Sequence, residues 1–189
     1  PYSGLAMTAL NAGEYKKALG YAQKSIGYYQ NHADEELESL LDSYILFSRI
    51  YHLGFRDLYK AQLYISKALL LAAKTGSPTN ASDAYVQQAS LCLERKEWNP
   101  AIVWARKALD TNDQDPQHNI GLFKTLAHAY SALGNATEAQ HNIDLLYDTM
   151  EEQSTTKYQS ALSEMEVRYQ TLEKEAQLRE LEQQNRMSQ

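Results

Sequence analysis

Residues 123–147 read FKTLAHAYSALGNATEAQHNIDLLY, which contains two apolar stripes at helical spacing with a turn between them. The first stripe consists of Phe123, Leu126, Ala127 and Tyr130, and the second of Ala139, Ile143 and Leu146. Gly134 interrupts the period and marks the turn. Because neither helix could bury its stripe alone, we expect two antiparallel helices, with Ala127 and Ala139 at their closest approach and Tyr130 beside the turn.

Three similar units precede this one, and each carries an alanine in the stripe of its second helix. The equivalent residues are Ala18, Ala61, Ala101 and Ala139, at intervals of 43, 40 and 38 residues. In the second unit, Tyr51 and Ala61 are one residue further apart than the equivalent pair of the last unit, so we expect a lengthened turn at Leu53–Arg56. The first unit, residues 5–26, has Gly13 at its turn, and we interpret it as lacking its beginning.

Two polar segments are predicted to be loops between these units. Residues 75–83, TGSPTNASD, are rich in capping and turn residues, so we expect helix to resume at Ala84 after an N-cap at Ser82 or Asp83. Residues 111–118, TNDQDPQH, are predicted to form the next loop for the same reason.

This pattern resembles the tetratricopeptide repeat (TPR), in which Leu and a small residue, then Tyr, precede a turn glycine and an alanine of the second helix. The resemblance implies an all-α fold, a right-handed α-solenoid of about four helical hairpins whose concave face is lined by the first helix of each pair. The intervals exceed the family's repeat of about 34 residues, and longer helices and loops account for the difference. We expect the TPR array to occupy residues 1–148.

Residues 149–189 are expected to form a long C-terminal capping or coiled-coil helix, because no Gly or Pro interrupts them. Five apolar residues alternate at spacings of four and three, as in a coiled-coil seam: Tyr158, Leu162, Met165, Tyr169 and Leu172. Glu164 and Arg168, four residues apart, favour an exposed helix. We expect the first half of this helix to cap the array, and we expect two copies to pair through the seam as a homodimer.

The run KYQSALSEMEVRYQTLEKEAQLRELEQQN, residues 157–185, resembles the helix that follows TPR arrays in bacterial sensor histidine kinases and in TPR-containing helix-turn-helix regulators. In those families the helix leads to a membrane span and then to a signalling domain. The resemblance therefore implies a signal-transduction protein, such as part of a two-component system, and favours the periplasmic side of a membrane-anchored protein over the cytoplasm. A generic Glu- and Gln-rich dimerising helix is the alternative.

Composition excludes several classes of function. The net charge is −6, from 18 Lys and Arg against 24 Asp and Glu, which argues against direct binding to nucleic acid. No apolar run approaches the roughly 20 residues that cross a bilayer. The N-terminal PYSGLAMTAL has neither a basic region nor an initiator Met, so we interpret the chain as an excised fragment whose membrane attachment lies in a segment outside it.

Signatures of catalysis are not found. The five histidines have no HExxH spacing and there are no paired cysteines, so no metal site is predicted. Cys92 is predicted to be a buried packing residue, because a thiol in apolar surroundings has a raised pKa and is inert. The glycines stand singly, so no phosphate-binding loop and no cofactor are expected. We therefore predict no enzyme in this chain, although a kinase could lie in a module beyond it.

The candidate ligand-binding residues are polar side chains on the first helix of each pair, on the side away from the apolar stripe. Aligning the units places six of them toward the concave face: Arg49, His52, Asp83, Ser90, Lys124 and His128. The TPR proteins that clamp a C-terminal carboxylate use a fixed Lys/Asn/Asn/Lys/Arg set. Lys124 matches one member, but His128 stands where Asn is expected, so no such clamp is predicted. A solvated inner face without a dedicated ligand is the alternative.

These patterns predict a non-catalytic scaffold that binds a protein or peptide. We interpret it as the sensory or interaction region of a larger bacterial signal-transduction protein, either a sensor kinase or a transcription regulator. Binding on the concave face would then shift the packing or the dimer geometry of the C-terminal helix. The alternative is a stand-alone soluble adaptor that holds two proteins together without a sensing step.

Overall fold

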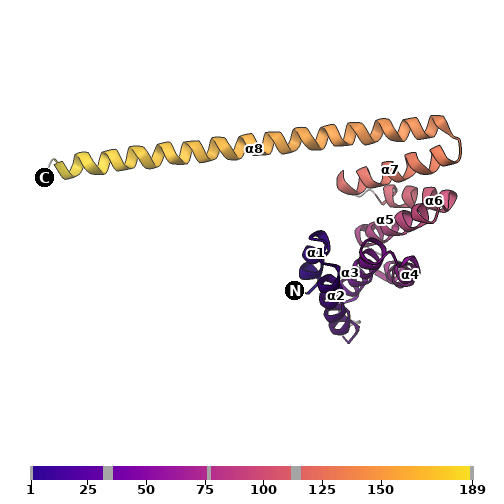
Figure 1. Ribbon diagram of the computed structural model, residues 1–189. Coiled ribbons are helices and arrows are strands. Elements are labelled where there is room, and N and C mark those ends of the chain that lie inside the picture. The colour runs from indigo at the N-terminus through magenta and orange to yellow at the C-terminus, as the bar shows by residue number, and fades with distance from the viewer. Residues whose placement is uncertain (1, 32–35, 76–77, 112–115, 188–189) are drawn as a thin grey trace. The chain divides into compact units, whose positions relative to one another are not determined.

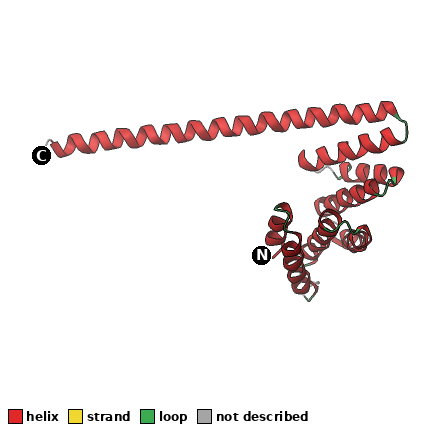
Figure 2. Cartoon of the chain, viewed as in Figure 1, coloured by secondary structure: helices red, strands yellow, loops and turns green. Residues whose placement is uncertain are grey.

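The structure is a computed structural model that describes residues 2–31, 36–75, 78–111 and 116–187 (Figure 1). For some residues near the gaps and in the distal part of the last helix, the backbone alone is described. Within these ranges the structure contains helices, turns and no strand, which confirms the predicted all-α class (Figure 2). The elements are α1 (Tyr2–Asn11), α2 (Tyr15–Gln30), α3 (Leu37–Arg49), the π-helix η1 (Ile50–Gly54), α4 (Leu58–Thr75), α5 (Pro78–Glu94), α6 (Trp98–Leu109), α7 (Pro116–Ala132) and α8 (Ala136–Met187).

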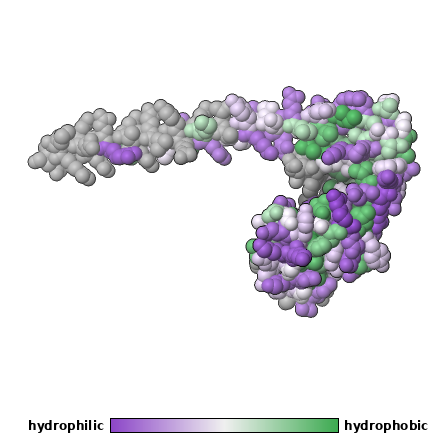
Figure 3. Space-filling model, in the orientation of Figure 1, coloured by the Kyte–Doolittle hydropathy of each residue, from purple (hydrophilic) through white to green (hydrophobic). Residues whose placement is uncertain are grey.

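Helices that follow one another in the chain pack together from α1 to α7. In addition, α1 packs on α3, α3 on α5, and α5 on α7. The odd-numbered helices, which are the first helices of the successive pairs, therefore adjoin one another in series. Figure 3 shows polar and apolar residues interspersed on the visible face of this part of the molecule.

Small side chains are buried at equivalent positions of the paired helices. The four alanines predicted to be equivalent in the second helices, Ala18, Ala61, Ala101 and Ala139, are all buried. The first helices carry a matching set of small buried residues: Ala6, Ser48, Ala89 and Ala127. A small residue on each side lets two helix backbones come close enough for the larger side chains around them to interlock. Ala127 and Ala139, which we predicted to lie at the closest approach of the last two helices, are both buried.

Three of the pairs are joined by the same turn. At Gly13, Lys96 and Gly134 the backbone has a positive φ of 74°, 61° and 74°. In each turn the next residue donates its N–H to the carbonyl five residues earlier, as from Glu97 to Cys92 at 2.8 Å. This is a Schellman-type helix end, which satisfies carbonyls that the helix leaves unpaired.

The second pair has a longer turn, as its sequence interval predicts. Asp57 donates its N–H to the carbonyl of Tyr51, six residues earlier, at 3.0 Å. The additional residue is taken up by η1, because a π-helical turn contains one residue more than an α-helical turn. The helix consequently extends through Gly54 into the segment predicted to be turn, and the turn itself lies at Phe55–Asp57.

Two helices begin earlier than the sequence analysis predicts. We expected helix to resume at Ala84, but α5 begins at Pro78, and α7 begins at Pro116 inside the second predicted loop. Proline suits a first helical position, because its missing N–H would have no partner there and its φ is already helical. In α5 the additional turn also buries Ala81 and Ser82 against neighbouring helices.

The contacts divide the chain into two compact units, and the division falls inside α8, between Leu146 and Tyr147. The first unit contains α1 to α7 and the start of α8, whereas the second consists of the rest of α8. The backbone of α8 is helical across this division. Among the residues described, no helix combines the length and apolar character needed to span a membrane.

Candidate ligand groove

A hollow of about 300 Å³ lies between α1, α3 and α5, and we call it the groove. The described residues that line it are Ser3, Gly4, Met7, Asp42, Ile45, Leu46, Arg49 and Asp83. They come from the first helix of each of three successive pairs. Its walls therefore come from the series of odd-numbered helices.

The lining residues occupy equivalent positions in their helices when the helices are aligned on the turn hydrogen bonds. Met7 and Arg49 each lie two residues before the carbonyl that the turn N–H caps. Asp42 and Asp83 each lie nine residues before it. The groove is thus lined by repeated positions of the first helices.

An ion pair between α3 and α5 forms one side of the groove. The Nη2 atom of Arg49 donates to Oδ1 of Asp83 at 3.2 Å. Both side chains are half-buried, at 24% and 35% exposure, so water screens the pair less than it would screen one on the open surface. The pair joins the second helical pair to the third.

Asp42 lies seven residues before Arg49, which places both on one face of α3. Its side chain has no hydrogen bond or ion pair with any residue that the structure describes. The pKa of the Asp42 carboxyl is raised, first by removal of water and then by the charges of Asp83 and Glu38, while Arg49 opposes the change. Because the side chain remains exposed, solvent screens part of this effect.

Part of the lining, which we call the apolar wall, is formed by Met7, Ile45 and Leu46. Ile45 and Leu46 are buried at 4% and 3% exposure, and Met7 is half-buried. Ser3 contributes a hydroxyl, which is already bonded to Ser25 at 2.7 Å. The groove therefore combines an apolar surface with two carboxylates and one guanidinium, the mixture typical of sites that recognise a side chain.

The six predicted ligand residues do not all lie together. The structure brings Arg49 and Asp83 into direct contact in the groove. His52 belongs to η1 and is buried at 6% exposure, and its Nδ1 lies 3.5 Å from Nε2 of Gln87 on α5. Burial lowers the pKa of His52. It is thus a packing residue of the interface between helix pairs.

The other three predicted residues lie outside the lining of the groove. Ser90 is half-buried and donates its hydroxyl hydrogen to the carbonyl of Val86 in its own helix at 3.0 Å. Lys124 and His128 are exposed on α7, one helical turn apart. Relative to the turn hydrogen bonds, Ser90 and His128 are equivalent to Arg49, and Lys124 is equivalent to Ile45.

Sequence reasoning missed Asp42 and the apolar wall. The signal for Asp42 was its spacing, because it lies two helical turns before Arg49 and is equivalent to Asp83. The equivalence becomes visible only when the helices are aligned on their turn hydrogen bonds. The predicted loop ending at Asp83 concealed it, since no helical register was assigned there.

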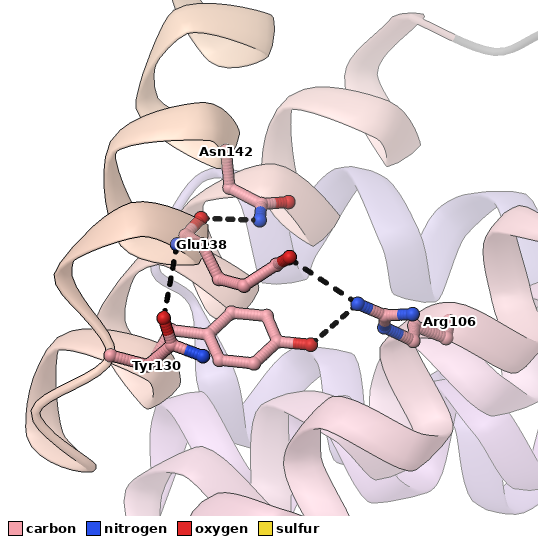
Figure 4. Close-up of polar contacts among 5 residues, drawn as sticks. Arg106, Tyr130, Glu138 and Asn142 are labelled. Carbon is pink, nitrogen blue, oxygen red and sulfur yellow. Dashed lines mark hydrogen bonds and ion pairs between the residues drawn. The ribbon is translucent and has the colours of Figure 1, made fainter.

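A second polar cluster joins α6 to the last helical pair (Figure 4). The Nη2 atom of Arg106 donates to the hydroxyl of Tyr130 at 2.6 Å and to Oε2 of Glu138 at 3.4 Å. The amide of Asn142 donates to the carbonyl of Glu138 at 2.8 Å. Tyr130 is half-buried and packs against the cluster formed by α5, α6 and α7. These groups are engaged with one another, so we assign this cluster to packing.

Cys92 packs in the core, as predicted. It is 2% exposed and lies against Ala101 and Ala129. Burial raises the pKa of its thiol, and Nε2 of Gln88 donates to Sγ at 3.4 Å, which has the opposite effect. The described part of the chain contains no group of three or more His, Cys, Asp and Glu side chains placed to hold a metal ion.

The predicted seam of α8 is described only in part. Tyr158 and Met165 are both 71% exposed. The backbone of Leu162, Tyr169 and Leu172 belongs to α8, but their side chains lie outside the described residues.

Comparison with models of known protein families gives no match, and comparison with curated proteins gives no significant match. We therefore infer the function from the residues themselves.

Proposed function

We propose that the first unit is a TPR-type, right-handed α-solenoid whose odd-numbered helices form a concave face, and that the groove on this face binds a protein or peptide segment. The observation that carries the proposal is that equivalent positions of α1, α3 and α5 jointly line one hollow. The recurring Schellman-type turns and the repeated small residues support the repeat architecture.

The proposed role of this chain is recognition without catalysis. The polar groups of the groove are an ion pair, an exposed carboxylate and a hydroxyl that is bonded to Ser25. None of the described lining residues is a nucleophile paired with a general base. A surface of this composition can select a side chain by charge and shape.

We further propose that the chain is the sensory region of a larger bacterial signal-transduction protein, with α8 as its output element. The helix runs continuously from the last helical pair into the second unit, so a movement of that pair can pass directly into it. Two copies would pair through the seam of Tyr158, Leu162, Met165, Tyr169 and Leu172. The resemblance of residues 157–185 to the helices of sensor kinases and regulators supports this assignment.

Site-specific photo-crosslinking in the source cells tests the binding role. A photoreactive amino acid is placed at Met7 or Ile45 in the groove, and at Tyr59 or Val103 as controls on even-numbered helices. The control positions are 79% and 63% exposed, so they are open to chance encounters. We expect one partner to be captured from both groove positions and from neither control. Equal capture at all four positions would exclude the groove as the binding face.

Once the partner is identified, the distance between two α8 helices distinguishes a sensor from an adaptor. Spin labels at Leu178, which is 62% exposed in the second unit, report the separation of two α8 helices in a dimer. A sensor changes this separation when the crosslinked partner is added, whereas an adaptor leaves it unchanged.

A further inference from the structure

The charges around the groove favour a ligand of one sign. Arg49 is the only cation among the described residues that line it, and its guanidinium is already paired with Asp83. Asp42 has no such partner among the described residues. One guanidinium and two carboxylates leave one negative charge without a counterion in the groove.

An acidic ligand would fit this arrangement poorly. To reach Arg49 it would have to displace Asp83 and also approach Asp42, so like charges would oppose it at two points. A basic side chain would find the Asp42 carboxylate exposed and available for a charge-assisted hydrogen bond. Removal of water, and then the charges of Asp83 and Glu38, raise the pKa of Asp42, so a cation bound beside its carboxylate would relieve part of this cost.

The apolar wall fits the stem of a long cationic side chain. Lysine and arginine lay their methylene groups along apolar surface while the charged end reaches a polar group. Met7, Ile45 and Leu46 provide such a surface beside Asp42. The volume of about 300 Å³ is at the small end of ligand sites, which suits one long side chain and part of a neighbour.

We propose that the groove recognises a Lys or Arg side chain of a peptide that also carries an apolar residue beside it. Asp42 pairs with the cation, while Met7, Ile45 and Leu46 hold the stem and the apolar neighbour. The inference depends on the proposed function, because it names the chemistry of the ligand for the same groove.

Peptide arrays provide the test, with the full chain as the probe. Acetylated and amidated nonapeptides carry Leu-Lys-Leu, Leu-Gln-Leu or Leu-Glu-Leu at the centre and mixed residues elsewhere. We expect the Lys series to retain the most protein. The best Lys peptide and its Gln counterpart are then titrated by fluorescence anisotropy, and amide shifts of Met7 and Ile45 in NMR spectra locate the bound peptide.

Three variants give the decisive comparison. Asp42→Asn should weaken binding of the Lys peptide about tenfold, the loss expected for one charge-assisted hydrogen bond. Asp110→Asn removes the same charge from an exposed site at the end of α6 and should leave the affinity unchanged. Arg49→Gln removes the cation from the lining of the groove and should strengthen binding of the Lys peptide severalfold.

The outcomes also separate this inference from the proposed function. If the Glu or Gln series shifts the groove amides as strongly as the Lys series, or if Asp42→Asn binds the Lys peptide normally, the charge preference is wrong while the groove remains a binding site. If Arg49→Gln abolishes binding, the ligand is acidic and the inference is overturned. If no series shifts the amides of Met7 or Ile45, both the inference and the proposed function fail.

Discussion

Gly54 allows η1 to pass close to α2. A Cβ atom at this position would lie 2.6 Å from Cγ and 2.9 Å from Cβ of Tyr15, which is closer than such atoms can approach. We therefore expect Gly54→Ala to lower the free energy of unfolding by about 1–3 kcal/mol, as overpacking does. Urea denaturation measures the change.

Gly20 and Gly27 in α2 provide matched controls, because an added Cβ would meet nothing within 4 Å at either position. Alanine there should raise stability by about 0.5–1 kcal/mol, the usual gain for replacing glycine within a helix. A Gly54→Ala variant that gains stability in the same way would show that Tyr15 can move aside freely.

Two aspartates should respond in opposite ways to replacement by asparagine. The raised pKa of Asp42 means that its ionised form is disfavoured in the folded state, so Asp42→Asn should stabilise the fold at neutral pH. The pKa of Asp57 is lowered, chiefly by the hydrogen bond that its carboxylate accepts from the N–H of Lys60 at 3.0 Å, so Asp57→Asn should destabilise the fold. Thermal denaturation of both variants shows whether each substitution raises or lowers stability. A loss of stability in Asp42→Asn would mean that its carboxylate has a structural partner.

His52 makes stability depend on pH in the mildly acidic range. In the folded state its pKa is lowered from the ordinary value of 6.5, chiefly by burial. The unfolded chain keeps the ordinary pKa, so it binds a proton at a higher pH than the folded chain does. The contribution of neutral His52 to the free energy of unfolding is therefore fully present above the unfolded pKa, and it is lost as the pH decreases below that value. We expect the urea midpoint to drop between about pH 7 and about pH 5.5, and to drop less in His52→Gln. Equal drops in both proteins would assign the effect to other groups.

At the scale of the helix, the sequence predicted those features that depend on neighbouring residues alone. The interval from Tyr51 to Ala61 predicted the longer turn, and the structure takes up the additional residue in η1. The beginnings of α5 and α7 were missed, because the polar segments that contain Pro78 and Pro116 are rich in turn-forming residues and were interpreted as loop throughout. Burial of Ala81 and its neighbours favours helix there, and this contribution comes from helices distant in sequence.

The seam of α8 predicts a dimer that charged residues would separate. Glutamate at both Tyr158 and Met165 should abolish association, because it would place like charges inside a coiled-coil interface. Glutamate at both Ser160 and Val167 is the matched control, since these positions face away from the seam in the same two heptads. Sedimentation equilibrium gives the mass of each protein. The pairing hypothesis fails if the unmodified chain is a monomer, or if the control separates as readily as the seam variant.

At the scale of the whole molecule, the core of the first unit is not one cluster. A large buried cluster extends from α1 to α5, whereas two smaller clusters lie among α5, α6 and α7. Regions with fewer buried contacts open more easily. We expect amides of α7 to exchange with deuterium faster than those of α3, once intrinsic rates are taken into account. Uniform exchange across both helices would indicate a single cooperative unit.

The groove marks the limit of prediction from this sequence. Arg49 and Asp83 were identified as candidates because each is polar on a first helix, but their pairing across two helices depends on how those helices are offset. Lys124 and His128 lie outside the lining because α7 contributes none of its described residues. The periodicity of a sequence shows which face of a helix a residue occupies. The position of a neighbouring helix depends instead on the packing of the whole series.

If α8 is the output element that we propose, its second part would act as a lever. Residues 147–187 span about 60 Å at 1.5 Å per residue. A tilt of about 5° at Leu146 would therefore displace the far end by about 5 Å, roughly the rise of one helical turn. Small rearrangements in the last helical pair would thus be magnified at the end of the helix, where a displacement of this size is enough to change which side chains meet a neighbouring helix.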